Sequence, residues 1–204
     1  MSIKSKVLAG AAMLSVITGG LGVAAATAHA STPSCGSSCI EISNGGLVLD
    51  VYKGAADVNQ KVIMWGLTNW DKATDFVATR EGSVHDFYQA GLASAALNLH
   101  YAWAQAYQIQ YAPYGVETGL CVASYDVNGG PVTLRPCGLS AKSTWVAVKA
   151  QGGYELINGA DKNFSDPNVL TNRNGVVYNA PLRGFVGGTV QDNQVWTYTT
   201  GVAS

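Results

Sequence analysis

The sequence predicts an all-β protein whose strands are arranged as three similar units. Short runs of apolar and β-branched residues alternate with turns rich in glycine and asparagine, which is typical of a sandwich or a barrel. Only 12% of the residues are charged, while 24 are glycine, a balance that suits an extracellular β domain. The same order of strands and large aromatic residues also recurs along the chain, which indicates internal repetition.

Eight segments carry the strand signal most clearly. They are residues 47–52, 61–65, 75–78, 108–111, 132–135, 144–149, 154–157 and 194–199. The turns between them include Asn44-Gly45-Gly46, Asn158-Gly159 and Asn174-Gly175, residue types that tolerate positive φ. Residues 92–111 are ambiguous: aromatic residues at alternate positions predict a strand from about Tyr101 onward, preceded by a helical turn or a loop.

The repeats align through their strands and their large aromatic residues. In the second and third units the alignment places Cys121 with Val169, Thr133 with Pro181 and Trp145 with Trp196. The first unit joins them if its first hairpin is three residues longer, which places Leu49 with Val122, Trp65 with Arg135 and Phe76 at the later tryptophans. Three such units predict a pseudo-threefold β barrel.

The N-terminal segment has the features of a secretory signal peptide. Lys4 and Lys6 precede an apolar stretch that ends in Ala28-His29-Ala30, so residues 1–30 are predicted to be cleaved and residues 31–204 to form a single domain. The alternative is a retained membrane anchor, but glycine, serine and threonine dilute the apolar stretch. We therefore expect a secreted, extracellular protein with no stable membrane span after cleavage.

The charge balance argues against a nucleic-acid partner. Ten basic and thirteen acidic residues follow residue 30, a formal net charge of −3, so no basic field is present to hold phosphates. The remaining candidate partners are a glycan or cell-wall polysaccharide, or an extracellular protein.

All four cysteines lie after the predicted signal peptide, where disulfides persist. Cys35, Cys39, Cys121 and Cys137 allow three connectivities, of which pairing within each local loop is the simplest. Zinc binding by the first two lacks a second Cys or His pair at the usual spacing. We expect neither a metal ion nor another cofactor.

Three motifs stand out within the repeats. They are Asp192-Asn193-Gln194-Val195-Trp196, which is the strongest, then Leu49-Asp50-Val51 and Val62-Ile63-Met64-Trp65. In these motifs the sequence resembles the ricin-type β-trefoil lectin family, in particular its secreted, actinobacterial-like members, and the first motif is similar to the family's Q-x-W signature. The resemblance covers about residues 40–199, apart from an insertion near 83–105. The resemblance implies a β-trefoil of about twelve short strands and a disulfide between Cys121 and Cys137.

The Q-x-W pattern has a structural meaning first. We expect Trp145, Trp196 and Phe76 to fill the shared core, because large aromatic side chains supply most apolar area there. The glutamine would satisfy buried backbone groups with its amide.

The resemblance also implies a sugar site built from an acidic residue that ends the first strand, an aromatic platform on the second and an asparagine near Q-x-W. A carboxylate accepts hydrogen bonds from sugar hydroxyls, while an aromatic face stacks on their C–H side. Asp50 and Trp65 are therefore the predicted carbohydrate-binding residues, although Ala73 stands at the asparagine position. The other two units have Ala123 and Thr171 in place of the acid, and Tyr52, Trp70, Tyr125 and Tyr178 are further candidate stacking surfaces. The competing interpretation makes Asp50 a solvated strand end and Trp65 a packing residue.

Catalysis is the least supported function. His85 and His100 are the only histidines after residue 30, and neither lies in a nucleophile or metal motif. We predict no catalytic residues and a non-catalytic, lectin-like protein. The alternative function is a protein-binding trefoil, such as a protease inhibitor, that would use the 83–105 insertion as its contact loop.

Overall fold

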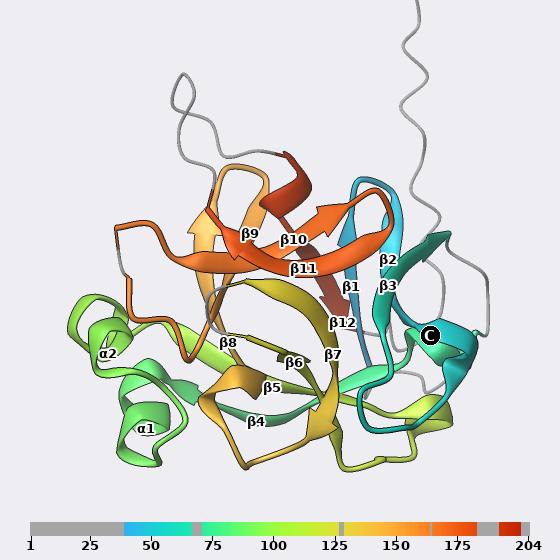
Figure 1. The fold of residues 1–204 in the computed structure, drawn as a ribbon, viewed down its shortest axis with the longest axis horizontal. Helices are drawn as coiled ribbons and strands as arrows, with labels where there is room; N and C mark the ends of the chain where they lie inside the picture. The colour runs from blue at the N-terminus through green and yellow to red at the C-terminus, as the bar shows by residue number, and fades with distance from the viewer. Residues whose placement is uncertain (1–38, 67–70, 127–128, 164, 183–191, 201–204) are drawn as a thin grey trace, which may run out of the picture.

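The protein is a β-trefoil. The computed structural model describes residues 39–66, 71–126, 129–163, 165–182 and 192–200, and within these ranges twelve strands join in one continuous antiparallel sheet (Figure 1). The predicted signal peptide, residues 1–30, lies outside the described residues. The all-β fold and the three units predicted from the sequence are confirmed.

Each unit contributes four strands. The first has β1 (Ile40–Asn44), β2 (Leu47–Val51), β3 (Val62–Gly66) and β4 (Phe76–Ser83). The second has β5 (Gln105–Tyr111), β6 (Leu120–Ser124), β7 (Gly130–Pro136) and β8 (Thr144–Ala150). The third has β9 (Gly153–Asn158), β10 (Asn168–Arg173), β11 (Val176–Pro181) and β12 (Thr197–Thr200). Short 3-10 helices follow or precede the strands: η2 (Tyr52–Gly54), η3 (Lys72–Thr74), η4 (Pro113–Gly115), η5 (Ala141–Ser143) and η6 (Asp192–Gln194).

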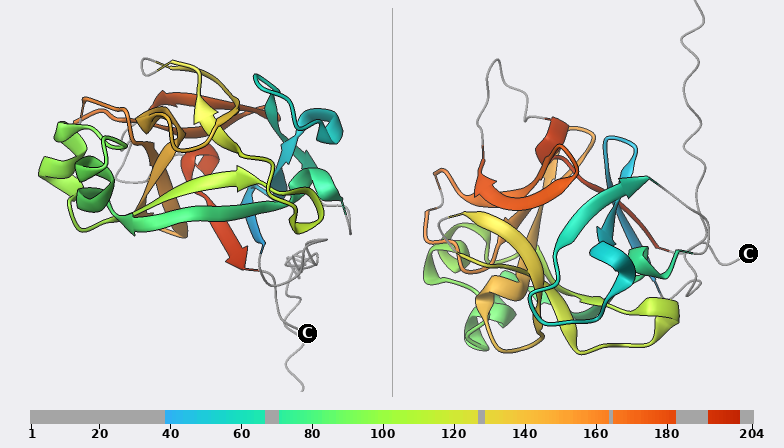
Figure 2. Two further views of the ribbon diagram at one scale, coloured as in Figure 1. Left: turned by 90° about the horizontal axis from the view of Figure 1, so that it is seen from below. Right: turned by 45° about the vertical axis from the view of Figure 1, so that its right-hand side comes forward.

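The outer strands of the units form a closed barrel. The pairing order is β12, β1, β4, β5, β8 and β9, and Figure 2 gives two further views of these strands. Tyr154 and Trp196 close the ring through two backbone hydrogen bonds of 2.8 Å. Closure leaves the barrel without an open edge.

The inner strands form three hairpins that cover one end of the barrel. Their contacts repeat around a pseudo-threefold axis: Lys61 pairs with Thr133, Pro131 with Tyr178 and Val176 with Ile63. Tyr178 is therefore the structural counterpart of Thr133, and the predicted match of Thr133 with Pro181 is wrong. The third hairpin is three residues shorter than the second, because Asn174-Gly175 closes it as a two-residue turn with positive φ at both positions.

Large aromatic residues fill the core, as the sequence predicts. Phe76, Trp145 and Trp196 are almost completely buried. Trp145 Nε1 donates to the Val122 carbonyl at 2.8 Å, and Trp196 Nε1 donates to the equivalent Leu170 carbonyl at 2.9 Å. The conserved geometry explains why two units use tryptophan, whose polar N–H finds the same partner in each.

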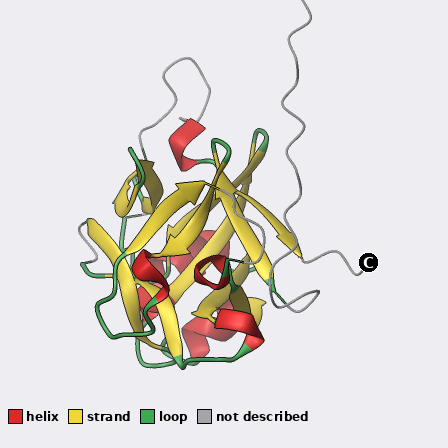
Figure 3. Ribbon diagram, turned by 90° about the vertical axis from the view of Figure 1, so that its right-hand side faces the viewer, coloured by secondary structure: helices red, strands yellow, loops and turns green. Residues whose placement is uncertain are grey.

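The insertion forms two short helices on the flank of the barrel rather than a free contact loop. They are α1 (Val84–Gln89) and α2 (Ala95–Tyr101), and Figure 3 distinguishes them from the strands. Val84, Phe87 and Leu97 are buried in a second apolar cluster that includes Val146 and Ile157 of the barrel. No helix in the described part of the chain is long and apolar enough to cross a membrane.

The predicted strand from about Tyr101 actually begins at Gln105, because the residues before it are helical. Ser94 caps α2, its Oγ accepting from the Leu97 amide at 3.1 Å. Trp103 lies between α2 and β5 and is 88% exposed. The aromatic alternation that predicted a strand holds only from Tyr107 onward.

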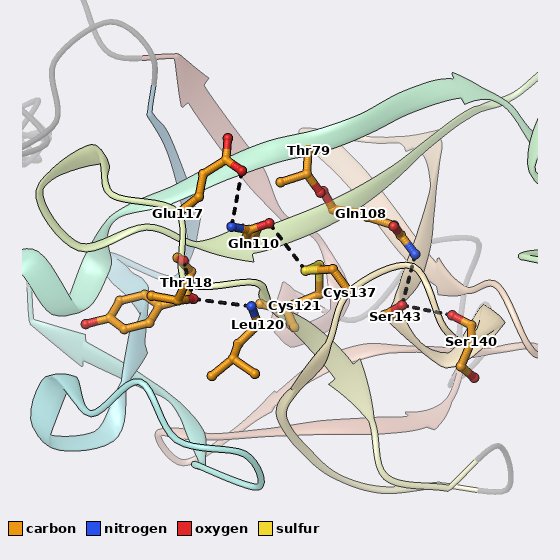
Figure 4. The surroundings of a disulfide bond; sticks show 12 residues. Thr79, Gln108, Gln110, Glu117, Thr118, Leu120, Cys121, Cys137, Ser140 and Ser143 are labelled. Carbon is orange, nitrogen blue, oxygen red and sulfur yellow. Dashed lines mark hydrogen bonds between the residues drawn. A yellow bond between two sulfur atoms is a disulfide. The ribbon is translucent and has the colours of Figure 1, made fainter.

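A disulfide closes the second hairpin. Cys121 of β6 is bonded to Cys137, directly after β7, as Figure 4 shows. This confirms the pairing that the family resemblance implies. Cys39 is also disulfide-bonded, and Cys35 lies outside the described residues.

Candidate functional site

The two residues predicted to bind carbohydrate share one cleft. The cleft measures about 280 Å³ and is lined by Asp50, Tyr52, Lys53, Gly54, Ile63, Trp65, Asp71, Lys72 and Ala73. In the β2–β3 ladder Asp50 pairs with Ile63, and Trp65 lies two residues further along the same face. Leu49 and Met64 point to the opposite face and belong to the core. The strand pleat therefore separates the cleft residues from the core residues.

Trp65 offers a stacking surface. Its side chain is 58% exposed, so the indole is not a core residue. Tyr52, at the end of β2, is also exposed and lines the same cleft. Trp70, a further candidate from the sequence, lies outside the described residues. The cleft thus combines two aromatic faces that solvent reaches.

Asp50 is the one buried charged residue in the lining of the cleft. It is only 4% exposed, and its carboxylate has no hydrogen-bond partner in the described part of the chain. Burial, and to a lesser degree the nearby Asp71 carboxylate, raises the pKa of Asp50 to about 7. A carboxylate whose acceptor positions are unfilled is suited to receive donors from a ligand.

Another part of the cleft lining, Asp71 to Ala73, comes from the turn before β4. Asp71 caps η3, its Oδ1 accepting from the Ala73 amide at 2.9 Å. Gly54 lies close to this turn: a Cβ at Gly54, whose φ is +60°, would be only 3.4 Å from Lys72 Cε. Sequence reasoning missed Asp71 and Lys72, although both precede Phe76 in the segment that corresponds to Q-x-W.

The other two units have clefts at equivalent places. The second is about 520 Å³ and is lined by Ala123, Ser124, Tyr125, Asp126, Arg135, Pro136, Leu139, Ser140, Lys142 and Ser143. The third is about 600 Å³ and is lined by Leu47, Thr171, Asn172, Arg173, Asn174, Gly175, Asn193 and Gln194. Each cleft therefore lies between a hairpin and the 3-10 helix that precedes the unit's last strand.

The amide nitrogens of Asn193 and Gln194, in the third cleft, donate hydrogen bonds within the protein. Gln194 Nε2 donates to Thr171 Oγ1 and to the Pro181 carbonyl, both at 3.0 Å. Asn193 Nδ2 donates to the Asn172 carbonyl at 3.0 Å. The predicted structural role of the Q-x-W glutamine is confirmed. Because these amides hold the hairpin, the third cleft presents fewer donors to a ligand.

Neither of the two histidines in the described part of the chain lines the first cleft. His85, on α1, contacts Asn98 Oδ1 through Nδ1 at 3.1 Å and has its ring 6.4 Å from that of Trp103. His100 lies on the exposed side of α2. Among the described residues, no group of three or more His, Cys, Asp or Glu side chains is placed to hold a metal ion.

Comparison with known proteins gives the fold. No protein-family model matches the chain, and no curated protein matches it in sequence. A designed threefold-symmetric protein, ThreeFoil, is 14% identical with a TM-score of 0.53, over 79% of this chain and 98% of that one.

Two natural proteins give similar values. An exo-β-1,3-galactanase from Clostridium thermocellum is 15% identical with a TM-score of 0.53, over 80% of this chain and 30% of that one. The cytolethal distending toxin of Haemophilus ducreyi is 10% identical with a TM-score of 0.52, over 82% of this chain and 86% of that one. At these identities the likeness shows the fold alone, and that fold is the β-trefoil.

Proposed function

We propose that this protein is an exported, non-catalytic carbohydrate-binding protein that holds a glycan in the first cleft. The observation that carries the proposal is the pairing of a buried, unpartnered carboxylate, Asp50, with an exposed indole, Trp65, on one face of the β2–β3 hairpin. A carboxylate beside an aromatic face is the combination that polyhydroxylated rings require.

The chemistry follows from the two side chains. Two adjacent sugar hydroxyls donate to the Asp50 oxygens, and charge-assisted hydrogen bonds of this kind are stronger than neutral ones. The C–H face of the same sugar packs on Trp65. Because the cleft is only about 280 Å³, it holds a small part of a glycan, and the rest of the glycan extends into solvent.

Export is part of the proposal. The signal-peptide pattern of residues 1–30 supports it, and the Cys121–Cys137 disulfide fits an oxidising, extracellular setting. Its test is the N-terminal sequence of the protein recovered from culture medium, which we expect to begin at Ser31. Recovery of the full-length chain from the membrane fraction would contradict cleavage.

A glycan array tests the binding function. We expect wild-type protein to bind a defined set of glycans, and Asp50→Ala and Trp65→Ala to lose that binding. Matched controls are Asp57→Ala and Trp103→Ala, which remove an exposed carboxylate and an exposed indole outside the cleft. Binding to no glycan, or equal binding by wild type and Asp50→Ala, would remove the assigned site.

The alternative function, protein binding through the insertion, has one observation in its favour. Leu99 and Trp103 are 77% and 88% exposed on or beside α2. Deleting residues 83–97 is not a fair test, because Phe87 and Leu97 fill the second apolar cluster. Protease inhibition assays with wild type and Trp103→Ser are suitable: inhibition that the substitution abolishes would favour this function.

A further inference from the structure

The second cleft has an excess of positive charge that the first lacks: two cations and one carboxylate line it, whereas two of each line the first. We propose that it is a separate binding site for an acidic saccharide, a sugar chain that carries carboxylate or sulfate groups, centred on Tyr125, Arg135 and Lys142. This site does not depend on the first cleft or on the neutral glycan proposed to bind there.

The hairpin registers show which residues correspond. Ala123 pairs with Thr133 as Asp50 pairs with Ile63, so Ala123 stands at the position of the first cleft's acid. Arg135 then corresponds to Trp65, two residues further along the second strand. The second unit has thus lost the carboxylate and gained a cation on the same face.

The 3-10 helix adds a second cation. Ala73 is the middle residue of η3, and Lys142 is the middle residue of η5. Figure 4 shows how η5 is held: Gln108 Nε2 donates to Ser143 Oγ at 3.0 Å, and Ser143 Oγ donates to the Ser140 carbonyl at 2.8 Å. The backbone that carries Lys142 is therefore fixed by buried polar contacts.

Both cations lie beside one exposed tyrosine. The Arg135 guanidinium is 5.2 Å from the centroid of the Tyr125 ring, and Lys142 Nζ donates to the Tyr125 carbonyl at 3.1 Å. Tyr125 itself is 58% exposed. Aromatic surface and positive charge are thus presented together, as a sugar ring with an anionic substituent requires.

A neighbouring cleft extends the site. It measures about 470 Å³ and shares Tyr125 and Arg135 with the second cleft. Its other lining residues are Asn59, Lys61, Pro131 and Thr133. Thr133 is 6% exposed, and its Oγ1 has no hydrogen-bond partner in the described part of the chain. A buried hydroxyl without a partner is costly unless a ligand or water completes it.

The charges that face this surface are mainly positive. The second cleft and its neighbour are lined by three cations, Lys61, Arg135 and Lys142. Asp126 is the one carboxylate among the described residues of these two linings. Within the described ranges, neither Lys61 nor Arg135 forms an ion pair with a protein carboxylate. Their charges remain available to a ligand anion, for which arginine provides two parallel donors.

A saccharide fits better than the other polyanions. Three cations in a chain of net negative charge are too few to hold a nucleic-acid backbone. The hydroxyl of Thr133 and the amide of Asn59 suit the many hydroxyls of a sugar chain, which an acidic peptide lacks.

Binding assays with matched charged and neutral sugars test the proposal. The first pair is oligogalacturonate and its methyl ester, and the second is sulfated and unsulfated dextran oligomers; the two pairs distinguish carboxylate from sulfate. We expect at least one charged member to bind and its neutral partner to bind at least about tenfold more weakly, the scale of one lost charge-assisted contact. The proposal would be overturned if both members of each pair bound with equal affinity, or if oligoglutamate bound as tightly as the charged sugar.

Variants assign the site. Arg135→Gln combined with Lys142→Gln is expected to weaken binding of the charged sugar about tenfold or more, while Lys149→Gln, an exposed lysine of β8 outside both clefts, leaves it unchanged. Arg135→Lys should restore part of the affinity if charge is what matters. An equal loss in Lys149→Gln would show non-specific attraction and contradict the site.

The two clefts are tested independently. Asp50→Ala should leave binding of the acidic sugar intact, and the Arg135/Lys142 variant should leave array binding at the first cleft intact. Loss of acidic-sugar binding in Asp50→Ala would overturn the second site without touching the first. Circular dichroism of each variant separates loss of a site from loss of the fold.

Discussion

The first and second clefts have the same framework and different chemistry. Each lies between a two-stranded hairpin and a 3-10 helix, and in each the opposite face of the hairpin packs into the core through Leu49 or Val122. The charged residues that line the first cleft are two carboxylates, Asp50 and Asp71, and two lysines, Lys53 and Lys72. The second is lined by the cations of Arg135 and Lys142 and by one carboxylate, Asp126, so positive charge is in excess there.

This difference shows how a repeated fold separates stability from recognition. Strand residues alternate between the core and the cleft, so a substitution on the cleft face leaves the core contacts unchanged. The pseudo-threefold core restricts one set of positions to large apolar residues, while the outward set is free to take either charge. A substitution that disrupts the core should weaken binding at both clefts. A substitution in one cleft should leave binding at the other unchanged.

The largest effect is expected from the core tryptophans. Trp145→Ala or Trp196→Ala should lower the free energy of unfolding by about 3–5 kcal/mol, because each leaves a cavity and an unpaired carbonyl. Trp65→Ala, which removes an exposed indole, should change it by less than about 0.5 kcal/mol. Urea denaturation measures both, and a similar loss in all three variants would refute the division between core and cleft.

Removing the disulfide should act next most strongly. Cys121→Ala combined with Cys137→Ala opens a loop of 16 residues, for which chain entropy predicts a loss of about 3 kcal/mol. Because the bond closes the hairpin that carries Arg135, affinity for the acidic sugar should fall more than affinity at the first cleft. Thermal unfolding and the two binding assays measure these changes; an equal loss at both clefts would argue against a local effect.

Asp50→Asn should stabilise the protein while abolishing binding at the first cleft. The folded-state pKa of Asp50, about 7, lies above its ordinary value of 3.8, so folding disfavours the ionised form. The contribution of Asp50 to the stability of wild type is therefore fully present below about pH 3.8 and is lost as the pH rises through about 7. Asparagine escapes this loss, and we expect the variant to be more stable by about 1–3 kcal/mol at pH 8.

Denaturation at pH 4 and pH 8 tests this sign. The difference between Asp50→Asn and wild type should be small at the lower pH and large at the higher one. A difference that is constant across this range would mean that Asp50 is not held in a destabilising environment.

The smallest predicted effect is on pH dependence of binding. With a pKa of about 7, the ionised fraction of Asp50 rises about tenfold between pH 6 and pH 8, and affinity at the first cleft should rise with it. Isothermal titration at the two pH values should show a change at the first cleft only; parallel changes at both would contradict the charge assignment.

Much of the fold was predictable because the barrel strands carry their signal locally. Period-two runs and asparagine-glycine turns marked most strands, and the Q-x-W pattern placed Trp196 in the core. The insertion was harder. Its alanine-rich residues have helix propensity, yet aromatic residues at alternate positions imitate a strand. In the structure the Ser94 cap fixes the start of α2, and Leu97 packs on the barrel, so the helix runs to Tyr101 and the strand begins only at Gln105.

The first cleft could be inferred from a resemblance, but the second could not. A search for the acidic residue of each unit finds only a loss at Ala123. Tyr125, Arg135 and Lys142 are spread over 18 positions and meet only when the hairpin and η5 fold together. Arg135 and Lys142 are recognised as cleft residues because they occupy the positions of Trp65 and Ala73. That correspondence depends on strand register, which the sequence does not show.

The most direct test of two clefts with separate ligands is a titration followed by nuclear magnetic resonance. The indole N–H signal of Trp65 and the Nε–H signal of Arg135, assigned with Trp65→Phe and Arg135→Lys, report on the first and second clefts. Oligogalacturonate should shift the Arg135 signal and leave Trp65 in place, while the neutral glycan found on the array should do the reverse. If both ligands shift the same signal, or if neither shifts either one, the two clefts do not bind separate ligands as assigned.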